Sequence, residues 1–224
     1  MLRLVIAFSF STWMLQAHDV ITTAMTFDRE IVRILIERCA TCHHQGGTAF
    51  PLLTYAEARP WAVAIKEEIL RRRMPPWGAV KGFGEFRNDQ GLSAEELEVL
   101  LSWIDGGVPE GDEKNLPEIP KFPAGQSAVA PKGAITIGPA YKLLRPMKLD
   151  GLSPKVIPAK SSIKLPAELP NGVIEPLLWL DSYRAEFAHP FLFRKPMDLP
   201  AGTVIRGLPA GASVLLLPSV ALRP

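Results

Sequence analysis

Two cysteines and a histidine stand close together in the first third of the chain. Cys39, Cys42 and His43 form the pattern C-x-x-C-H, which is the residue pattern of c-type haem attachment. In such a site each thiol forms a thioether bond with the porphyrin, and the histidine presents a ring nitrogen to the iron. The spacing suits this chemistry because one turn of chain holds both sulfur atoms at the same edge of the macrocycle. The sequence therefore predicts one covalent haem c, with His43 as an iron ligand.

Three other interpretations of the same residues are possible. A structural zinc site needs four ligands, and the sequence has no second cysteine pair. A redox-active dithiol normally follows a strand in a βαβ unit, whereas the residues before Cys39 have a helical pattern. A simple disulfide between Cys39 and Cys42 leaves His43 without a role. Covalent haem is the interpretation that uses all three residues.

The elements around this motif are predicted to be helical. Asp28 is a candidate cap for the helix that precedes Cys39, and Thr54 and Ser93 each begin a capping box. The stretch Met74–Gly91 holds several glycines and is expected to be a loop. The expected helices lie around residues 31–38, over Pro60–Arg73 and from Ser93 to Gly106.

The second half of the chain has the pattern of short strands. Asn171–Gly172 between two apolar runs is a strong hairpin signal. The many prolines favour turns and edge positions. The expected strands are Ser161–Leu169, Val173–Leu180, Phe191–Arg194, Thr203–Arg206 and Ser213–Leu217.

The first residues resemble an export signal. A basic start at Arg3 and an apolar run from Leu4 to Leu15 are followed by small residues, as in a secretory signal peptide. The run is about half of the roughly 20 residues that a bilayer span needs. Cleavage is expected after Ala24, or else after Ala17, with an uncleaved anchor as the alternative. The predicted location is therefore the periplasm, with no membrane span after signal cleavage.

The composition is that of a globular protein and excludes some partners. The 224 residues are 47% hydrophobic and 21% charged, which is typical of a globular protein. The net charge of +2 is too small for an obvious nucleic-acid binder.

The sequence predicts α + β in two domains: a small all-α domain followed by a small antiparallel β-sandwich or barrel. The expected boundaries are a signal peptide at 1–24, a first domain at 25–112, a Pro-rich linker at 113–130 and a β domain at 131–224.

Over about Thr26–Asp112 the chain resembles the class I c-type cytochromes. The likeness consists of C-x-x-C-H after a first helix, a middle helix, a Met-bearing loop and a last helix. In that family the loop methionine is the second axial ligand of the iron, and the matching residue here is Met74. The resemblance therefore implies a cytochrome c fold with iron held by His43 and Met74. The alternative is that Met74 only fills the core.

A narrower resemblance is to bacterial proteins in which such a domain is fused to a β region similar to copper ascorbate-dependent monooxygenases. Copper chemistry is not carried over, because such enzymes need several histidine ligands and the second half holds only His189. The motifs that carry this resemblance are Arg59-Pro60-Trp61, Arg73-Met74-Pro75-Pro76-Trp77, Phe86-Arg87-Asn88-Asp89, Trp103-Ile104-Asp105-Gly106-Gly107, Glu175–Leu180 and Leu199–Thr203.

Other polar residues are expected to be structural. His44 is expected to be exposed, since a residue adjacent to His43 cannot reach the opposite face of a haem. His189 is expected to be a packing or surface residue. The basic residues Arg59, Lys66 and Arg71–Arg73 are expected to be a solvated helix face relieved by Glu67 and Glu68, with docking of acidic partners as the alternative.

These observations favour single-electron transfer between periplasmic redox proteins, with the β domain as a docking module and no catalysis by the chain itself. Two alternatives stay open. The chain is a haem-based sensor or small-molecule binder if the sixth iron site is free. It is a haem-bearing accessory subunit of a periplasmic oxidoreductase if the β half carries the main interaction. A haem peroxidase is disfavoured because the chain offers no clear distal acid–base residue.

Overall fold

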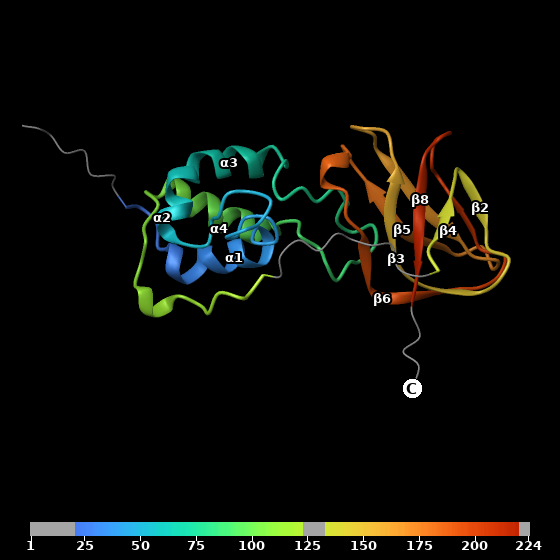
Figure 1. The fold of residues 1–224 in the computed structure, drawn as a ribbon, viewed down its shortest axis with the longest axis horizontal. Helices are drawn as coiled ribbons and strands as arrows, with labels where there is room; N and C mark the ends of the chain where they lie inside the picture. Colours follow the sequence, from blue (N-terminus) through green and yellow to red (C-terminus); the bar gives the residue numbers. More distant parts are fainter. Residues whose placement is uncertain (1–20, 123–132, 220–224) are drawn as a thin grey trace, which may run out of the picture.

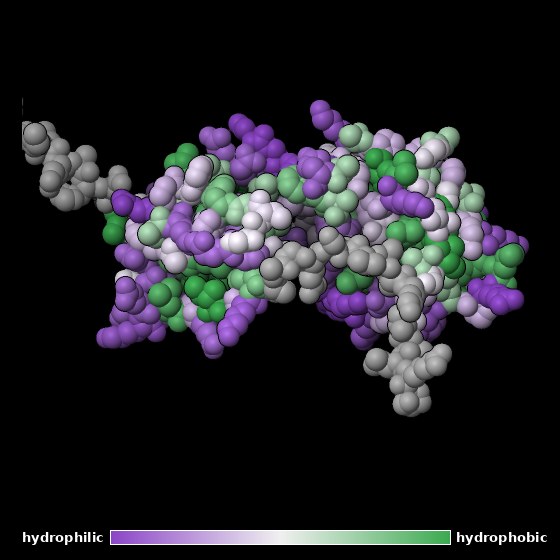
Figure 2. All heavy atoms as spheres, in the orientation of Figure 1, coloured by the Kyte–Doolittle hydropathy of each residue, from purple (hydrophilic) through white to green (hydrophobic). Residues whose placement is uncertain are grey.

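The computed structural model describes residues 21–122 and 133–219. The predicted signal peptide therefore falls almost wholly outside the described residues, as does the end of the predicted linker. Figure 1 shows the helices gathered at one end of the molecule and the sheets at the other. On the face drawn in Figure 2, hydrophobic residues form separate patches among hydrophilic ones.

The helices are short and are joined by long loops. A π-helical turn at Phe27–Ile31 leads into α1, and a 3-10 turn at Arg59–Trp61 joins α2 to α3. The α-helices are α1 (Val32–Arg38), α2 (Tyr55–Ala58), α3 (Ala62–Leu70) and α4 (Ala94–Asp105). Their lengths range from four residues in α2 to 12 in α4. They enclose a core that includes Phe27, Leu35, Leu100 and Trp103.

Local capping chemistry explains where two helices begin. Thr54 caps α2 and Ser93 caps α4, each in a complete capping box with Glu57 and Glu96. Both boxes were predicted and are confirmed. The prediction that Asp28 caps the first helix is wrong: Asp28 lies inside the π-helical turn and is buried. The N-cap is Thr26, whose backbone N–H donates to the Glu30 carboxylate at 3.0 Å.

The strands form two four-stranded antiparallel sheets that share one hydrophobic core. One sheet has the order β1-β8-β3-β6, and the other has the order β2-β7-β4-β5. The strands are β1 (Ile135–Ile137), β2 (Ala140–Lys142), β3 (Met147–Val156), β4 (Ile163–Glu168), β5 (Ile174–Leu180), β6 (Phe191–Leu199), β7 (Val204–Arg206) and β8 (Ser213–Pro218).

The β4–β5 hairpin around Asn171–Gly172 is confirmed, with Gly172 at φ 83°. Strands β1, β2 and β3 were not predicted, and within β3 Gly151 and Pro154 argue locally against a strand. The structure needs Gly151 there, since a Cβ would lie 2.4 Å from the carbonyl oxygen of Phe191 on β6. A register shift next to Pro154 lets β3 continue past the proline.

Residues 78–88 join the outer strands of both sheets. Val80 donates to the Trp179 carbonyl at 2.8 Å, and the Asp181 N–H donates to the Gly78 carbonyl at 2.9 Å, which pairs this segment with the end of β5. Further along, the Arg87 N–H donates to the Leu192 carbonyl of β6 at 2.8 Å. In Figure 1 this teal-to-green segment runs from the helical end into the sheets.

The expected fold class, an all-α cytochrome c domain followed by a separate β-sandwich or barrel, is wrong. The larger of the two hydrophobic cores belongs to the two antiparallel sheets, and the helices are short. The physical reason is that the Met74–Gly91 stretch is not a loop of a helical domain. Its side chains Ala79 and Phe86 are buried in the sheet core, and Trp77 packs against that core.

Within the described part of the predicted linker, Asp112 caps a 3-10 turn at Glu113–Asn115. The Arg33 guanidinium donates to the Asn115 carbonyl, so this turn lies against the helices. Across residues 21–122 and 133–219, no helix has the length and apolar character that a bilayer crossing demands.

Candidate functional site

The C-x-x-C-H residues lie on one turn directly after α1. Cys39 is the C-cap of that helix, and its N–H still donates to the Leu35 carbonyl at 2.9 Å. The carbonyl of Cys39 then accepts from the N–H groups of Cys42 at 3.2 Å and His43 at 3.0 Å. Both cysteines are free thiols. The two cysteines and His43 therefore share one hydrogen-bonded turn.

The imidazole of His43 is oriented by a backbone carbonyl. Its Nδ1 lies 2.8 Å from the Phe50 carbonyl oxygen, which can only accept, so Nδ1 carries the proton. The other ring nitrogen, Nε2, is then the one with a lone pair. Metal-binding histidines commonly donate their second ring N–H to a backbone carbonyl, which fixes the tautomer and the ring plane. His43 is therefore prepared to bind a metal through Nε2.

The loop that returns from His43 to Phe50 is tightly folded. The Ala49 N–H donates to the Cys42 carbonyl at 3.1 Å. At Gly47 a Cβ would lie 2.3 Å from that same carbonyl oxygen, so only glycine fits. The prediction that His44 is exposed is wrong: it is buried, with Nδ1 2.7 Å from the Ala40 carbonyl oxygen. This bond is of the same kind as that of His43, so it is the position directly after Cys42 that distinguishes His43 as the candidate iron ligand.

Apolar surface is available beside His43. The Phe50 ring packs edge-on against the imidazole at 4.9 Å and stacks on Trp61 at 4.3 Å. Phe50 and Trp61 are each 44% exposed. Covering such an aromatic surface is favourable, and a porphyrin is a planar apolar group that can do so.

Burial and neighbouring charges act on the Cys39 thiol. Burial, together with Cys42 and Glu96 nearby, raises the pKa of Cys39 to about 12, against the opposing effect of Arg38. The attacking cysteine of a redox dithiol has a lowered pKa. The local environment is thus unlike that of a dithiol oxidoreductase.

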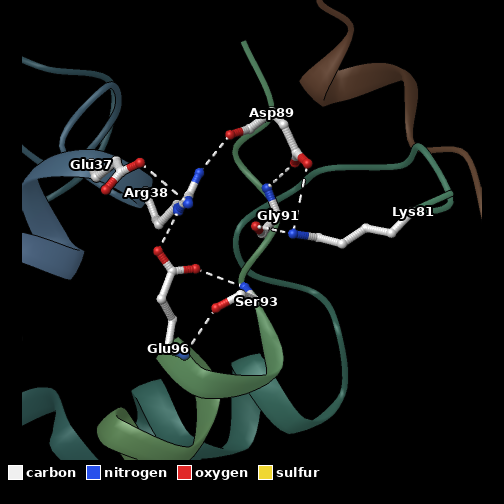
Figure 3. Close-up of polar contacts among 7 residues, drawn as sticks. All are labelled: Glu37, Arg38, Lys81, Asp89, Gly91, Ser93 and Glu96. Carbon is white, nitrogen blue, oxygen red and sulfur yellow. Dashed lines mark hydrogen bonds and ion pairs between the residues drawn. The ribbon is translucent and has the colours of Figure 1, made fainter. Parts of the chain in front are cut away.

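A polar network fixes the end of α1 next to the cysteines. The Arg38 guanidinium donates to the Glu96 carboxylate at 2.9 Å and to the Asp89 carbonyl at 2.7 Å (Figure 3). Burial works to raise the pKa of Glu96, but hydrogen bonds from Ser93 and Arg38 outweigh it and hold this pKa below its usual value. Lys81 donates to the Gly91 carbonyl and pairs with Asp89. The network ties the residue before Cys39 to α4 and to the segment that enters the sheets.

Met74 comes directly after the run of arginines that follows the third helix. It follows α3 in a segment where Arg72 has φ 53°, and it lines a cavity of about 810 Å³ between the helices and the sheets. None of Cys39, Cys42 and His43 is among the residues that line this cavity. The two cysteines and His43 thus share one turn, and Met74 lines a cavity to which that turn does not contribute.

The remaining polar residues have structural partners. Arg71 and Arg73 pair with Glu67 and Glu68, which confirms the expected relief of positive charge on this helix face. His189 lines the same cavity as Met74, with Nδ1 2.8 Å from the Phe187 carbonyl oxygen. Its Nε2 atom is buried and has no hydrogen-bond partner within the described residues.

The donor set fits a covalent haem. Two free thiols share one turn, and a neighbouring imidazole keeps Nε2 available next to exposed aromatic rings. Sequence reasoning missed the Phe50 carbonyl and the Arg38–Glu96 pair. A backbone acceptor leaves no trace in residue types, and Arg38 and Glu96 are 58 positions apart.

Comparison with known proteins gives no family assignment: no family model, curated protein or solved structure matches the chain.

Proposed function

We propose that this chain is an exported monohaem c-type cytochrome that carries single electrons between periplasmic redox proteins. Cys39 and Cys42 would anchor the haem through thioether bonds, and His43 would bind the iron through Nε2. A haem held in this way supplies an iron that alternates between the ferric and ferrous states without making or breaking substrate bonds. The proposed location rests on the signal-like residues 1–24.

The observation that carries this proposal is the hydrogen bond from His43 Nδ1–H to the Phe50 carbonyl. It selects the tautomer that leaves Nε2 unprotonated, and it does so on the turn that holds the two free thiols. A dithiol or a disulfide would not require an oriented imidazole. The raised pKa of Cys39 also argues against a reactive dithiol.

Met74 is the proposed sixth ligand. An axial methionine raises the reduction potential of a c-type haem. Support comes from its place in a loop stiffened by Pro75 and Pro76, where the thioether is not held on a helix. The sheets would provide the docking surface for redox partners.

A second candidate function is a haem-based sensor or small-molecule binder. The observation that favours it is that Met74 lines a cavity to which Cys39, Cys42 and His43 do not contribute. If Met74 does not reach the iron, the sixth site is open to an external ligand.

The test is the visible spectrum of the reduced protein, produced in a host that attaches haem c, with and without carbon monoxide. We expect a six-coordinate spectrum that carbon monoxide leaves unchanged. Haem should stay with the polypeptide under denaturing conditions, and it should be lost in the double variant C39A/C42A. The matched control is T41A, which alters the exposed residue between the two cysteines and should retain haem.

The other outcomes have distinct meanings. A protein that carries no haem would overturn the proposed function. Covalent haem that binds carbon monoxide rapidly would favour the sensor function over electron transfer.

A further inference from the structure

The residues directly after Met74 are held by strands of the second half. Trp77 follows Met74 by three positions, and the intervening Pro75 and Pro76 have restricted φ angles. The Trp77 N–H donates to the Pro75 carbonyl at 2.8 Å, so the link between Met74 and Trp77 is a short turn. The position of Trp77 therefore constrains the position of Met74.

Trp77 is packed by aromatic side chains of the β half. Its ring centroid lies 5.0 Å from His189 and 4.9 Å from Phe191, at the start of β6. Phe86, which belongs to the sheet core, contacts it at 5.8 Å. Beyond Trp77, the hydrogen bonds of Gly78 and Val80 to β5 prevent the segment from sliding along the sheet.

We propose that the β half sets the position of Met74, and that His189 is the positioning residue that acts through Trp77. This inference rests on the proposed haem site and deepens it. The β half is then part of what determines iron ligation, in addition to any docking role.

His189 suits this role because its own orientation is fixed. Its Nδ1 donates to the Phe187 carbonyl at 2.8 Å, and its ring also packs on Phe191 at 4.6 Å. Burial lowers the pKa of His189, so the ring is neutral and packs like an aromatic side chain. Phe187 and Tyr183 are the other aromatic residues that line the cavity on this side.

The cavity explains why losing this ring would be felt at Met74. Met74, Trp77 and His189 all line the same space of about 810 Å³. With the imidazole removed, Trp77 keeps its contacts with Phe86 and Phe191 but gains room to move toward the cavity. Met74 would move with it, and the sixth iron site would open part of the time.

The experiment compares three variants of the full-length haem protein. H189A removes the ring, H189F keeps an aromatic ring of similar size, and L216A truncates a buried β8 side chain of the same core. The readouts are the fraction of reduced haem that binds carbon monoxide rapidly and the reduction potential. Amide hydrogen exchange at Val80 and Asp181, whose N–H groups donate to the Trp179 and Gly78 carbonyls, adds a readout that does not depend on the iron.

We expect H189A to raise the fraction of reduced haem that binds carbon monoxide rapidly by roughly tenfold. This corresponds to a modest shift in the equilibrium between two positions of the loop that carries Met74. The reduction potential of H189A should fall, and exchange at Val80 should quicken. H189F should behave like the natural protein, and so should L216A. If H189A does not fold, W77F replaces it, because a smaller ring at Trp77 weakens the same contact.

Two results would overturn the inference while leaving the proposed function intact. One is a haem protein in which H189A binds carbon monoxide no faster than the natural chain. The other is an equal change in H189A and L216A, which would indicate a general loss of β-core stability. A natural protein without covalent haem would instead refute the proposed function.

Discussion

At the scale of single residues, the hydrogen bond between His43 and the Phe50 carbonyl decides how the imidazole can act. Nδ1 lies 2.8 Å from the carbonyl oxygen and carries the proton, which leaves the lone pair on Nε2. Cys39, Cys42 and His43 were predictable because only cysteine supplies a thiol and only histidine supplies an imidazole, so both groups can be read from the sequence. The Phe50 partner was not, since any residue type supplies a carbonyl.

Met74→Ala tests the proposed sixth ligand. Loss of the thioether should lower the reduction potential and let carbon monoxide bind the reduced iron, because an axial methionine stabilises the ferrous state. Measurement is by redox titration and by the visible spectrum with carbon monoxide. Met147→Ala, which truncates a methionine packed against the β core, is the control and should change neither. An unchanged spectrum in M74A would remove Met74 from the iron.

Asp28→Asn should stabilise the protein at neutral pH. Burial raises the pKa of Asp28, with further contributions from Glu110, Glu113 and Asp112. Among the residues that the structure describes, the buried Oδ2 of Asp28 has no hydrogen-bond partner. The folded state therefore binds a proton at a pH where the unfolded state does not, and the stability of the natural protein rises as pH falls toward 3.8. The gain in D28N should be about 1 kcal/mol at neutral pH, because the amide has no charge to desolvate or to be repelled by Glu110.

Urea unfolding of both proteins over a pH series checks this expectation. The stability difference should shrink as pH falls toward the pKa of the unfolded aspartate. A difference that grows on acidification would contradict the assigned direction of the pKa shift.

At the scale of elements, the start of α4 is where local and tertiary contacts meet. Glu96 closes the capping box with Ser93 and also accepts from Arg38 at the end of α1, where both side chains are 17% exposed. The capping box was predictable, because it joins residues three positions apart. The pairing with Arg38 was not, because it depends on how two helices come together.

Glu96→Gln should destabilise the protein by about 1–2 kcal/mol at neutral pH. Glutamine at this position still accepts from the Ser93 N–H, but the charge-assisted bond to Arg38 is lost. Because hydrogen bonds hold the pKa of Glu96 below 4.5, its contribution is present above that pH and is lost as pH falls through the folded-state pKa.

Thermal unfolding at several pH values measures this effect. The two proteins should converge in stability under strongly acidic conditions. Glu37→Gln is a suitable control, because that side chain is 65% exposed in its pairing with Arg38 and should contribute little.

Strand prediction succeeded where the signal was local and failed where it was not. The β4–β5 hairpin follows from Asn171–Gly172, but β3 contains Gly151 and Pro154, which locally argue against a strand. Gly151 is needed because β6 passes close to it, and that reason exists only in the folded sheet. The burial of Ala79 and Phe86 in the sheets was unpredictable for the same reason: it depends on strands about 100 positions further along the chain.

At the scale of the whole molecule, residues 78–88 make the two cores dependent on each other. The Asn88 side chain donates to the Pro190 carbonyl at 2.7 Å and accepts from the Leu192 N–H at 2.9 Å. The Arg87 guanidinium forms two hydrogen bonds with Asp150 on β3. The helices and the sheets are therefore expected to unfold together.

Asn88→Ala should reduce that coupling. Loss of two hydrogen bonds should lower stability by roughly 2 kcal/mol. Differential scanning calorimetry should show one transition for the natural protein and a broadened or split transition for N88A. Gln90→Ala in the same segment is the control, because Gln90 makes one long, exposed contact with Thr41 at 3.3 Å. A single sharp transition in N88A would mean that other contacts couple the two cores.

The pairing of residues 78–87 with β5 and β6 also bears on aggregation. Each of these strands lies at the end of its sheet, where bare backbone N–H and C=O groups invite pairing with other chains. Here a segment from the helical half occupies those groups. A fragment cut after that segment would therefore expose two open strand edges and the pocket left by Phe86. Proteolysis between the halves should thus yield a self-associating β fragment rather than a free, soluble docking module.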